Sequence, residues 1–232
     1  MIRLVFRSVV CAMVVGLGGT VAQAQPVDSL RGYNYGTGGG LTVLVTNNGF
    51  GLGGYYSRAI NEATSLWVEA SLGPGKDEQE LKLFNRFGGG FVQFKRNYFL
   101  MLPIAVGAQR RLFRESIEDN FRPYVQISGG PTLGWEYPYF EDANGNERFD
   151  EFTERRYGVF TALPKGDMRF GLGGTLALGA YFGLSRRVTQ GIRFGYSFTY
   201  FFEGVQLLEP AVKEPQQFFG TPAISLTFGR LF

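Results

Sequence analysis

The residue types that carry acid–base or metal chemistry at neutral pH are scarce in this sequence. It has no histidine and one cysteine, Cys11, in 232 residues. Serine–histidine hydrolases, histidine-dependent acyltransferases and most zinc enzymes need an imidazole, so the sequence argues against each of these classes. We therefore predict no catalytic residue and no resident cofactor, and we expect that the protein is not an enzyme.

Charged and amide side chains recur instead at alternate positions of several segments. They share one face with Gly, Ser and Thr residues, which leave room for long side chains to meet. A charge inside a protein is normally paired, and a satisfied internal network explains such residues better than catalysis does. The predicted polar network consists of Glu69, Arg111, Arg122, Gln126, Glu136, Arg169 and Arg193.

One stretch resembles a calcium-binding loop in the spacing of its oxygen ligands. The first, third, fifth and ninth positions of that pattern are Asp142, Asn144, Asn146 and Asp150. The sequence departs from the pattern twice, because Glu147 replaces the turn glycine and Thr153 replaces the bidentate glutamate. The alternative is an acidic, solvated turn. Calcium at this loop is the only metal that we predict.

The elements that must position these side chains are β-strands. From residue 192 to 202, the even positions are Ile, Phe or Tyr, while Arg193, Gly195, Ser197 and Thr199 fall between them. Successive strand residues point to opposite faces, so one face is aromatic and the other small or polar. The same pattern predicts eight strands, at residues 38–46, 50–60, 65–73, 98–113, 121–138, 167–185, 191–203 and 219–232.

The first 24 residues have the features of a cleaved export signal. Arg3 and Arg7 precede an apolar stretch that ends in an A-x-A pattern at Ala22 and Ala24. Of the 23 Lys and Arg residues, two leave with the signal, so the remainder nearly balances the 20 Asp and Glu residues. No basic surface suited to nucleic acid is left. We expect residues 25–37 to form a short periplasmic segment before a single domain at 38–232.

A soluble β-sandwich would also alternate, but two features favour a membrane barrel. Several strands exceed the 9–11 residues that span a bilayer, and aromatic residues gather at strand ends, as in the girdles of outer-membrane barrels. With the N-terminus in the periplasm, the short links 61–64, 114–120 and 186–190 lie on the periplasmic side. The long links 74–97, 139–166 and 204–218 are then extracellular, and 47–49 is a tight Asn-Asn-Gly hairpin. The sequence thus predicts an all-β, eight-stranded, antiparallel up-and-down transmembrane β-barrel.

The chain resembles the small eight-stranded outer-membrane barrels, the class of the OmpA transmembrane domain and OmpX. The resemblance rests on the repeated strand pattern and on the last strand, Ile224 to Phe232. Phe228 and Phe232 resemble the signal that the barrel-assembly machinery reads, whereas Arg230 departs from it. The resemblance implies the outer membrane of a Gram-negative-type bacterium, outer-membrane lipid and the assembly machinery as partners, and a monomer. A fold of this kind does not specify a function.

Three functions remain open at this point. The first is a non-enzymatic barrel with a structural or surface-interaction role that presents its extracellular loops. The second is a narrow channel, or a lateral path for small or hydrophobic molecules, since side chains just fill the interior of eight strands. The third, less favoured because histidine is missing, is an enzyme that modifies envelope lipids.

Overall fold

The computed structural model describes residues 37–80, 82–84, 90–113, 121–150, 154–182 and 188–231. The predicted signal, residues 25–36 of the segment that follows it and Phe232 lie outside these residues. Eight strands belong to one sheet: β1 Gly38–Thr46, β2 Gly49–Ala59, β3 Thr64–Gly75, β6 Asn97–Arg111, β7 Phe121–Pro138, β8 Asp167–Phe182, β9 Val188–Val205 and β10 Gln216–Leu231.

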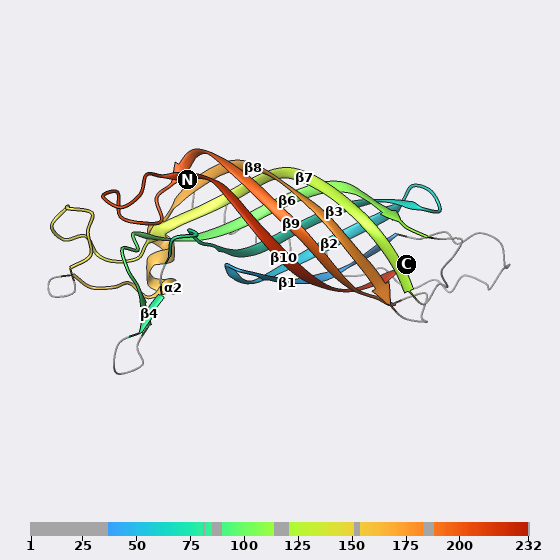
Figure 1. The fold of residues 1–232 in the computed structure, drawn as a ribbon, viewed down its shortest axis with the longest axis horizontal. Coiled ribbons are helices and arrows are strands. Elements are labelled where there is room, and N and C mark those ends of the chain that lie inside the picture. The colour runs from blue at the N-terminus through green and yellow to red at the C-terminus, as the bar shows by residue number, and fades with distance from the viewer. Residues whose placement is uncertain are drawn as a thin grey trace. The chain divides into compact units, whose positions relative to one another are not determined.

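Each strand pairs antiparallel with its neighbours, and β1 pairs with β10, so the sheet closes into a barrel (Figure 1). Closure gives every strand a partner on both sides over most of its length, which removes the free sheet edges of an open sheet. The predicted fold class and the number of barrel strands are confirmed. The strand bounds agree with the prediction to within a few residues.

The alternation fixes which side chains face outward. Ile127, Leu176 and Phe194 are 64 %, 59 % and 54 % exposed. Gln126, Ala177 and Arg193, their neighbours in sequence, are buried on the inner face. An outer surface covered with large exposed apolar side chains is unfavourable in water and suits contact with hydrocarbon.

Further elements lie in the long links. The strands β4 Lys82–Phe84 and β5 Gly90–Val92 pair within the link between β3 and β6. The helix α2 Val159–Ala162 and the 3-10 turn η1 Leu163–Lys165 lie between β7 and β8. Trp135 donates its indole N–H to the carbonyl of Leu163, which ties this turn to the wall. Within the described residues, no helix is long and apolar enough to cross a membrane.

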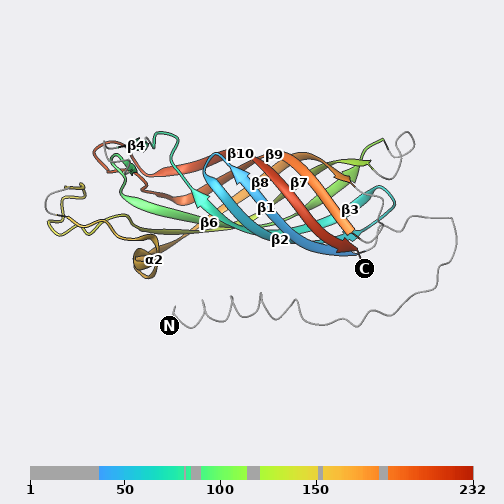
Figure 2. The same ribbon diagram turned by 90° about the horizontal axis from the view of Figure 1, so that it is seen from below.

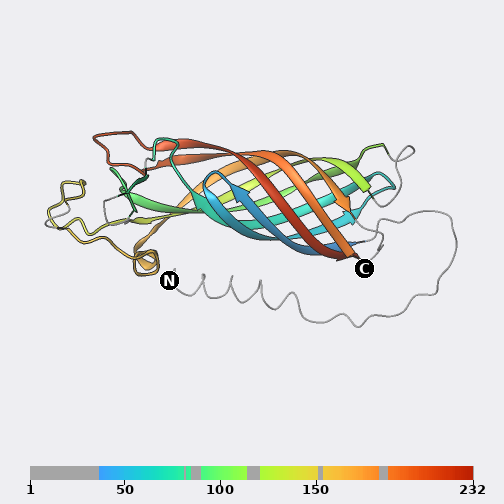
Figure 3. The same cartoon turned by 60° about the horizontal axis from the view of Figure 1, so that its bottom comes forward.

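We call the end of the barrel that carries these long links the loop end, and the opposite end the turn end. The strands β6 to β10 have 15 to 18 residues, whereas β1 and β2 have 9 and 11. The β1–β2 hairpin therefore stops short of its neighbours toward the loop end (Figures 2 and 3). Its turn contains Gly49 at φ 135°, a conformation that favours glycine.

Candidate functional site: the filled lumen and the loop-end cap

An ion pair crosses the middle of the lumen. Arg193 of β9 donates to both carboxylate oxygens of Glu69 on β3, at 2.8 and 2.9 Å. It also donates to Gln126 Oε1 at 3.1 Å and to Ser225 Oγ at 3.3 Å. Trp67 donates its indole N–H to Glu69 at 2.9 Å. All five side chains are buried or nearly so, and the bidentate geometry satisfies both charges inside the barrel.

Aromatic rings fill the lumen between this ion pair and the turn end. Trp67 stacks on Tyr55 with a centroid separation of 4.3 Å, and Tyr124 stacks on Tyr181 at 4.7 Å. Tyr181 also donates to Gln109 at 3.1 Å. The guanidinium of Arg122 lies 6.0 Å from the centre of the Tyr181 ring. A cavity of about 60 Å³ remains near the turn end, and Arg111 and Arg122 are among its lining residues.

An apolar cluster fills the lumen toward the loop end. Phe99, Phe201 and Phe219, from three different strands, meet with centroid separations of 5.1 to 5.6 Å. Val205 and Leu207 complete this cluster, and all five residues are buried. Because Leu207 follows β9, the link after that strand folds back over the lumen rather than away from it.

A second polar group sits beside the apolar cluster at the loop end. Arg169 donates to Glu136 at 2.8 Å and to Glu203 at 3.0 Å. Glu136 also accepts from the side chain of Asn97 at 2.8 Å and from the backbone N–H of Gln206 at 2.9 Å. The predicted lumen residues thus fall at separate levels, with Glu69, Gln126 and Arg193 at mid-barrel, Glu136 and Arg169 at the loop end, and Arg111 and Arg122 near the turn end.

Ion pairs and a β-bridge hold the long links in place, both within one link and between two of them. Lys95 contacts Glu80 at 2.8 Å, and both side chains are buried. Lys213 contacts Asp77 at 2.7 Å, across 136 positions of sequence. Residue Lys95 also forms a β-bridge with Leu208. We call the described parts of the links 76–96, 139–166 and 204–215 the loop-end cap.

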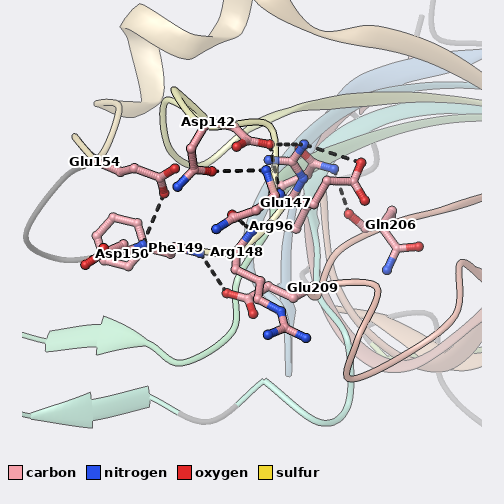
Figure 4. A network of polar contacts seen from close by, with 12 residues as sticks. Arg96, Asp142, Glu147, Arg148, Phe149, Asp150, Glu154, Gln206 and Glu209 are labelled. Carbon is pink, nitrogen blue, oxygen red and sulfur yellow. Dashed lines mark hydrogen bonds and ion pairs between the residues drawn. The ribbon is translucent and has the colours of Figure 1, made fainter.

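The link 139–166 contributes a network of its own to this cap (Figure 4). Asp142 accepts from the backbone N–H of Glu147 at 3.1 Å and lies 3.3 Å from the guanidinium of Arg96. The backbone N–H of Phe149 donates to Glu209 at 3.0 Å, which connects this link to 204–215. These contacts order the acidic link through hydrogen bonds to its own backbone and to an arginine.

The residues of the predicted calcium loop take part in that local ordering. Asn144 and Asn146 each accept a backbone N–H two residues further on, at 3.0 and 2.8 Å. The backbone N–H of Asp150 donates to Glu154 at 3.1 Å. Among the described residues, no three His, Cys, Asp or Glu side chains are grouped to hold a metal, and Thr153 is outside them. The calcium site stays a prediction.

The two proposed assembly residues differ in what the structure says of them. Phe228 is half exposed on the outer face of β10 and pairs in register with Leu41 of β1. Phe232 is outside the described residues.

Sequence reasoning missed two features of the lumen, the Tyr55–Trp67 stack and the Phe99–Phe201–Phe219 cluster. Strand alternation places Trp67 on the same face as Glu69, so the sequence did indicate that Trp67 lies in the lumen.

A cavity of about 110 Å³ lies between the ion pair and the apolar cluster. Small residues from several strands form much of its wall, including Gly130, Thr132, Thr175 and Ser197. Glu69 and Arg193 bound it on the side of the turn end, and Phe219 bounds it on the side of the loop end. The lumen is therefore filled above and below one central chamber.

Comparison with known proteins bears on the fold alone. No protein-family model matches the chain. No curated protein shows significant sequence similarity to it. Among solved structures, the outer membrane protein OprG from Pseudomonas aeruginosa matches with a TM-score of 0.43 and 12 % identity, over 87 % of this chain and 98 % of that one. The N-terminal β-barrel domain of Pseudomonas aeruginosa OprF matches with a TM-score of 0.42 and 9 % identity, over 87 % and 100 %.

Neisserial surface protein A matches with a TM-score of 0.38 and 11 % identity, over 84 % of this chain and 93 % of that one. All three TM-scores are below 0.5, so the assignment to the small outer-membrane barrels rests on the closed eight-stranded sheet and its apolar outer face. At such identities a shared fold does not transfer a function. What the protein does must be argued from its own outer surface, lumen and cap.

Proposed function

We propose that this protein is a non-enzymatic outer-membrane barrel that holds an ordered extracellular cap as a surface for interaction. The observation that carries the proposal is that the long links are joined to one another and to the filled lumen. Lys213–Asp77, Glu209–Phe149 and the Lys95–Leu208 bridge each connect two different links. Ordered loops on a rigid barrel are typical of binding surfaces.

The outer-membrane location rests on the outer face. Exposed Leu, Ile and Phe side chains occupy alternate positions of neighbouring strands, which a bilayer would cover. Aromatic side chains gather where the strands approach the loop end, among them Tyr98, Trp135, Tyr200 and Phe202. Rings of this kind lie at the interface of a bilayer with water.

An axial channel is the second candidate, and the filled lumen argues against it. The Arg193–Glu69 pair with its aromatic neighbours blocks one half of the lumen, and the Phe99–Phe201–Phe219 cluster under Leu207 blocks the other. An enzyme is the third candidate. The Arg193–Glu69 geometry is that of a satisfied ion pair, and the sequence supplies no imidazole to accept a proton.

The experiment that tests the proposal measures binding by the cap. Refolded wild-type barrel is applied to immobilised lipopolysaccharide, heparin, fibronectin, laminin and collagen, beside a variant in which residues 141–155 are replaced by a short Gly-Ser linker. Heat-modifiable mobility on a gel shows that both variants are folded. Binding by the wild type that the trimmed variant loses supports the proposal. Equal binding by both, or none to any of these surfaces, contradicts a role for this part of the cap in interaction.

A further inference from the structure

The barrel wall is incomplete beside the β1–β2 hairpin. Strand β1 pairs with β10 only as far as Thr46 and Ala223, yet β10 begins at Gln216. Strand β2 pairs with β3 in regular register as far as Leu72, and its residues Gly51 and Gly49 still lie against Gly73 and Pro74, so β2 covers β3 nearly to its end. Above the turn at 47–48, the first residues of β10, Gln216 to Gly220, therefore have no strand partner on the side of β1 among the described residues. We call this stretch the notch.

The notch begins at the aromatic girdle of the loop end and reaches a short way toward the middle of the barrel. Phe218 is exposed on the outer face of β10 and pairs with Tyr200 of β9, another exposed aromatic residue. Thr221, which the hairpin turn contacts through Asn47, is three residues further along β10, or about 10 Å along the strand at 3.3 Å per residue. With Phe218 and Tyr200 at the bilayer interface, the foot of the notch lies where the lipid chains begin.

The central cavity extends to the notch. Its lining includes Thr46 and Asn48 at the tip of the hairpin, Pro74 at the end of β3 and Thr221 on β10. Thr221 is hydrogen-bonded to Asn47, which fixes the turn against β10 at the foot of the notch.

The chemistry of the cavity suits a narrow apolar group. Leu44, Met101, Pro103 and Ala105 contribute apolar atoms from the inner face, and the threonines contribute methyl groups. Toward the loop end the Phe99–Phe201–Phe219 cluster closes the lumen, and toward the turn end the Arg193–Glu69 pair does. The volume of about 110 Å³ is of the order of the roughly 150 Å³ engineered apolar cavity that takes up benzene. It holds the end of a chain and not a whole lipid.

We propose that this cavity binds the end of an unbranched alkyl chain, which enters sideways from the bilayer through the notch. The site rests on the membrane location proposed above, and it does not depend on the cap or on its partners. Both an acyl chain of a membrane lipid and a small diffusing alkyl amphiphile have the required chemistry.

Trp67 is the natural reporter for this site. It is 1 % exposed, it donates to Glu69, and Arg193 lies over its ring at 5.8 Å, so it adjoins two residues that line the cavity. The chain has only two tryptophans, so Trp135→Phe leaves Trp67 as the sole indole fluorophore. This variant is refolded into phosphatidylcholine vesicles of two kinds. In the first, the acyl chains of the lipid carry bromine near their ends. In the second, the lipid carries no bromine and 8-bromooctanoate is added.

Two further variants block the site in different ways. Ala105→Phe fills the cavity from β6, and Ala108→Phe is its matched control because it adds the same ring to the outer face of the same strand. A hairpin lengthened by two residues in each strand covers the foot of the notch and keeps every side chain on its face. Heat-modifiable mobility shows that each variant is folded.

We expect bromine to quench the fluorescence of Trp67 at least twofold more in the Trp135→Phe protein and in its Ala108→Phe variant than in its Ala105→Phe or lengthened-hairpin variant. Quenching by brominated lipid identifies a membrane chain as the occupant, and quenching by 8-bromooctanoate alone identifies a small amphiphile. Equal quenching in all four variants means that bromine acts through the wall, and it overturns the proposal. Quenching of Trp135 by brominated lipid in a Trp67→Phe variant separately reports whether the barrel is in the membrane.

Discussion

The Arg193–Glu69 pair offers the sharpest test of how the lumen is held together. Three variants are needed: Arg193→Met, Glu69→Gln and the combination of both. Each side chain of the pair is 10 % exposed or less, and two hydrogen bonds of 2.8 and 2.9 Å join them. Removing either partner leaves the other charge buried in the lumen.

The magnitude follows from that burial. Breaking a buried ion pair by removing one partner costs about 3–5 kcal/mol, most of which is the penalty for the unpaired charge that remains. Each single variant should therefore lower the free energy of unfolding by that amount. Trp67 still donates to Glu69, and Gln126 and Ser225 still face Arg193, so the lower end of the range is expected. Removing both charges should cost less than removing either one.

The assay is reversible urea unfolding in lipid vesicles, followed by tryptophan fluorescence and checked by heat-modifiable mobility. A double-mutant cycle then gives the coupling between the two residues. The reasoning predicts a coupling of at least about 2 kcal/mol, because the double variant carries no orphaned charge. Losses that simply add would refute it and would show that water in the lumen solvates each residue separately.

Three further outcomes can be measured on the same barrel. Ile127→Arg should lower the free energy of unfolding by about 2–4 kcal/mol because that position faces lipid near the midplane. Ser197→Asn, which places a neutral polar side chain in the lumen, should cost less than Ile127→Asn, and equal losses from these two changes would contradict the assigned faces. Deleting Phe232 should reduce the amount of heat-modifiable barrel in the outer membrane, and an undiminished amount would count against its role in assembly. Arg96→Ala should make the link 139–166 more sensitive to protease because it removes the ion-pair partner of Asp142. In the wild type, protection of this link by calcium but not by an equal concentration of magnesium would show that the predicted calcium site exists.

Much of the fold can be predicted from the sequence because strand alternation is a local property. The run from Ile192 to Phe202 settles the faces of β9 by itself, and similar runs settle β7, β8 and β10. The sequence also predicts that the first two strands are short, with nine and eleven residues, and β1 and β2 have these lengths. The notch follows from these lengths once the register is known.

The cap and the levels of the lumen could not be predicted in the same way. Lys213 and Asp77 are 136 positions apart, and nothing near either residue indicates the other. The stagger between strands decides which charged side chains lie at the same level of the lumen. The predicted network therefore contained Arg193, Glu69, Arg169 and Glu136, but the sequence did not show that Arg193 pairs with Glu69 and Arg169 with Glu136. Phe99, Phe201 and Phe219 lie on inner faces where the pattern favours polar residues, and only the register brings them together.

The central claim is that the lumen is filled along its axis, with Arg193–Glu69 on one side of the chamber and the phenylalanine cluster on the other. Single-channel recording of the purified, refolded barrel in planar bilayers tests it most directly. We expect no stable conductance steps in the wild type, and steps only when both Phe99→Ala and Arg193→Ala are introduced. Regular, long-lived steps in the wild-type protein would mean that the lumen is open and that the barrel is a channel.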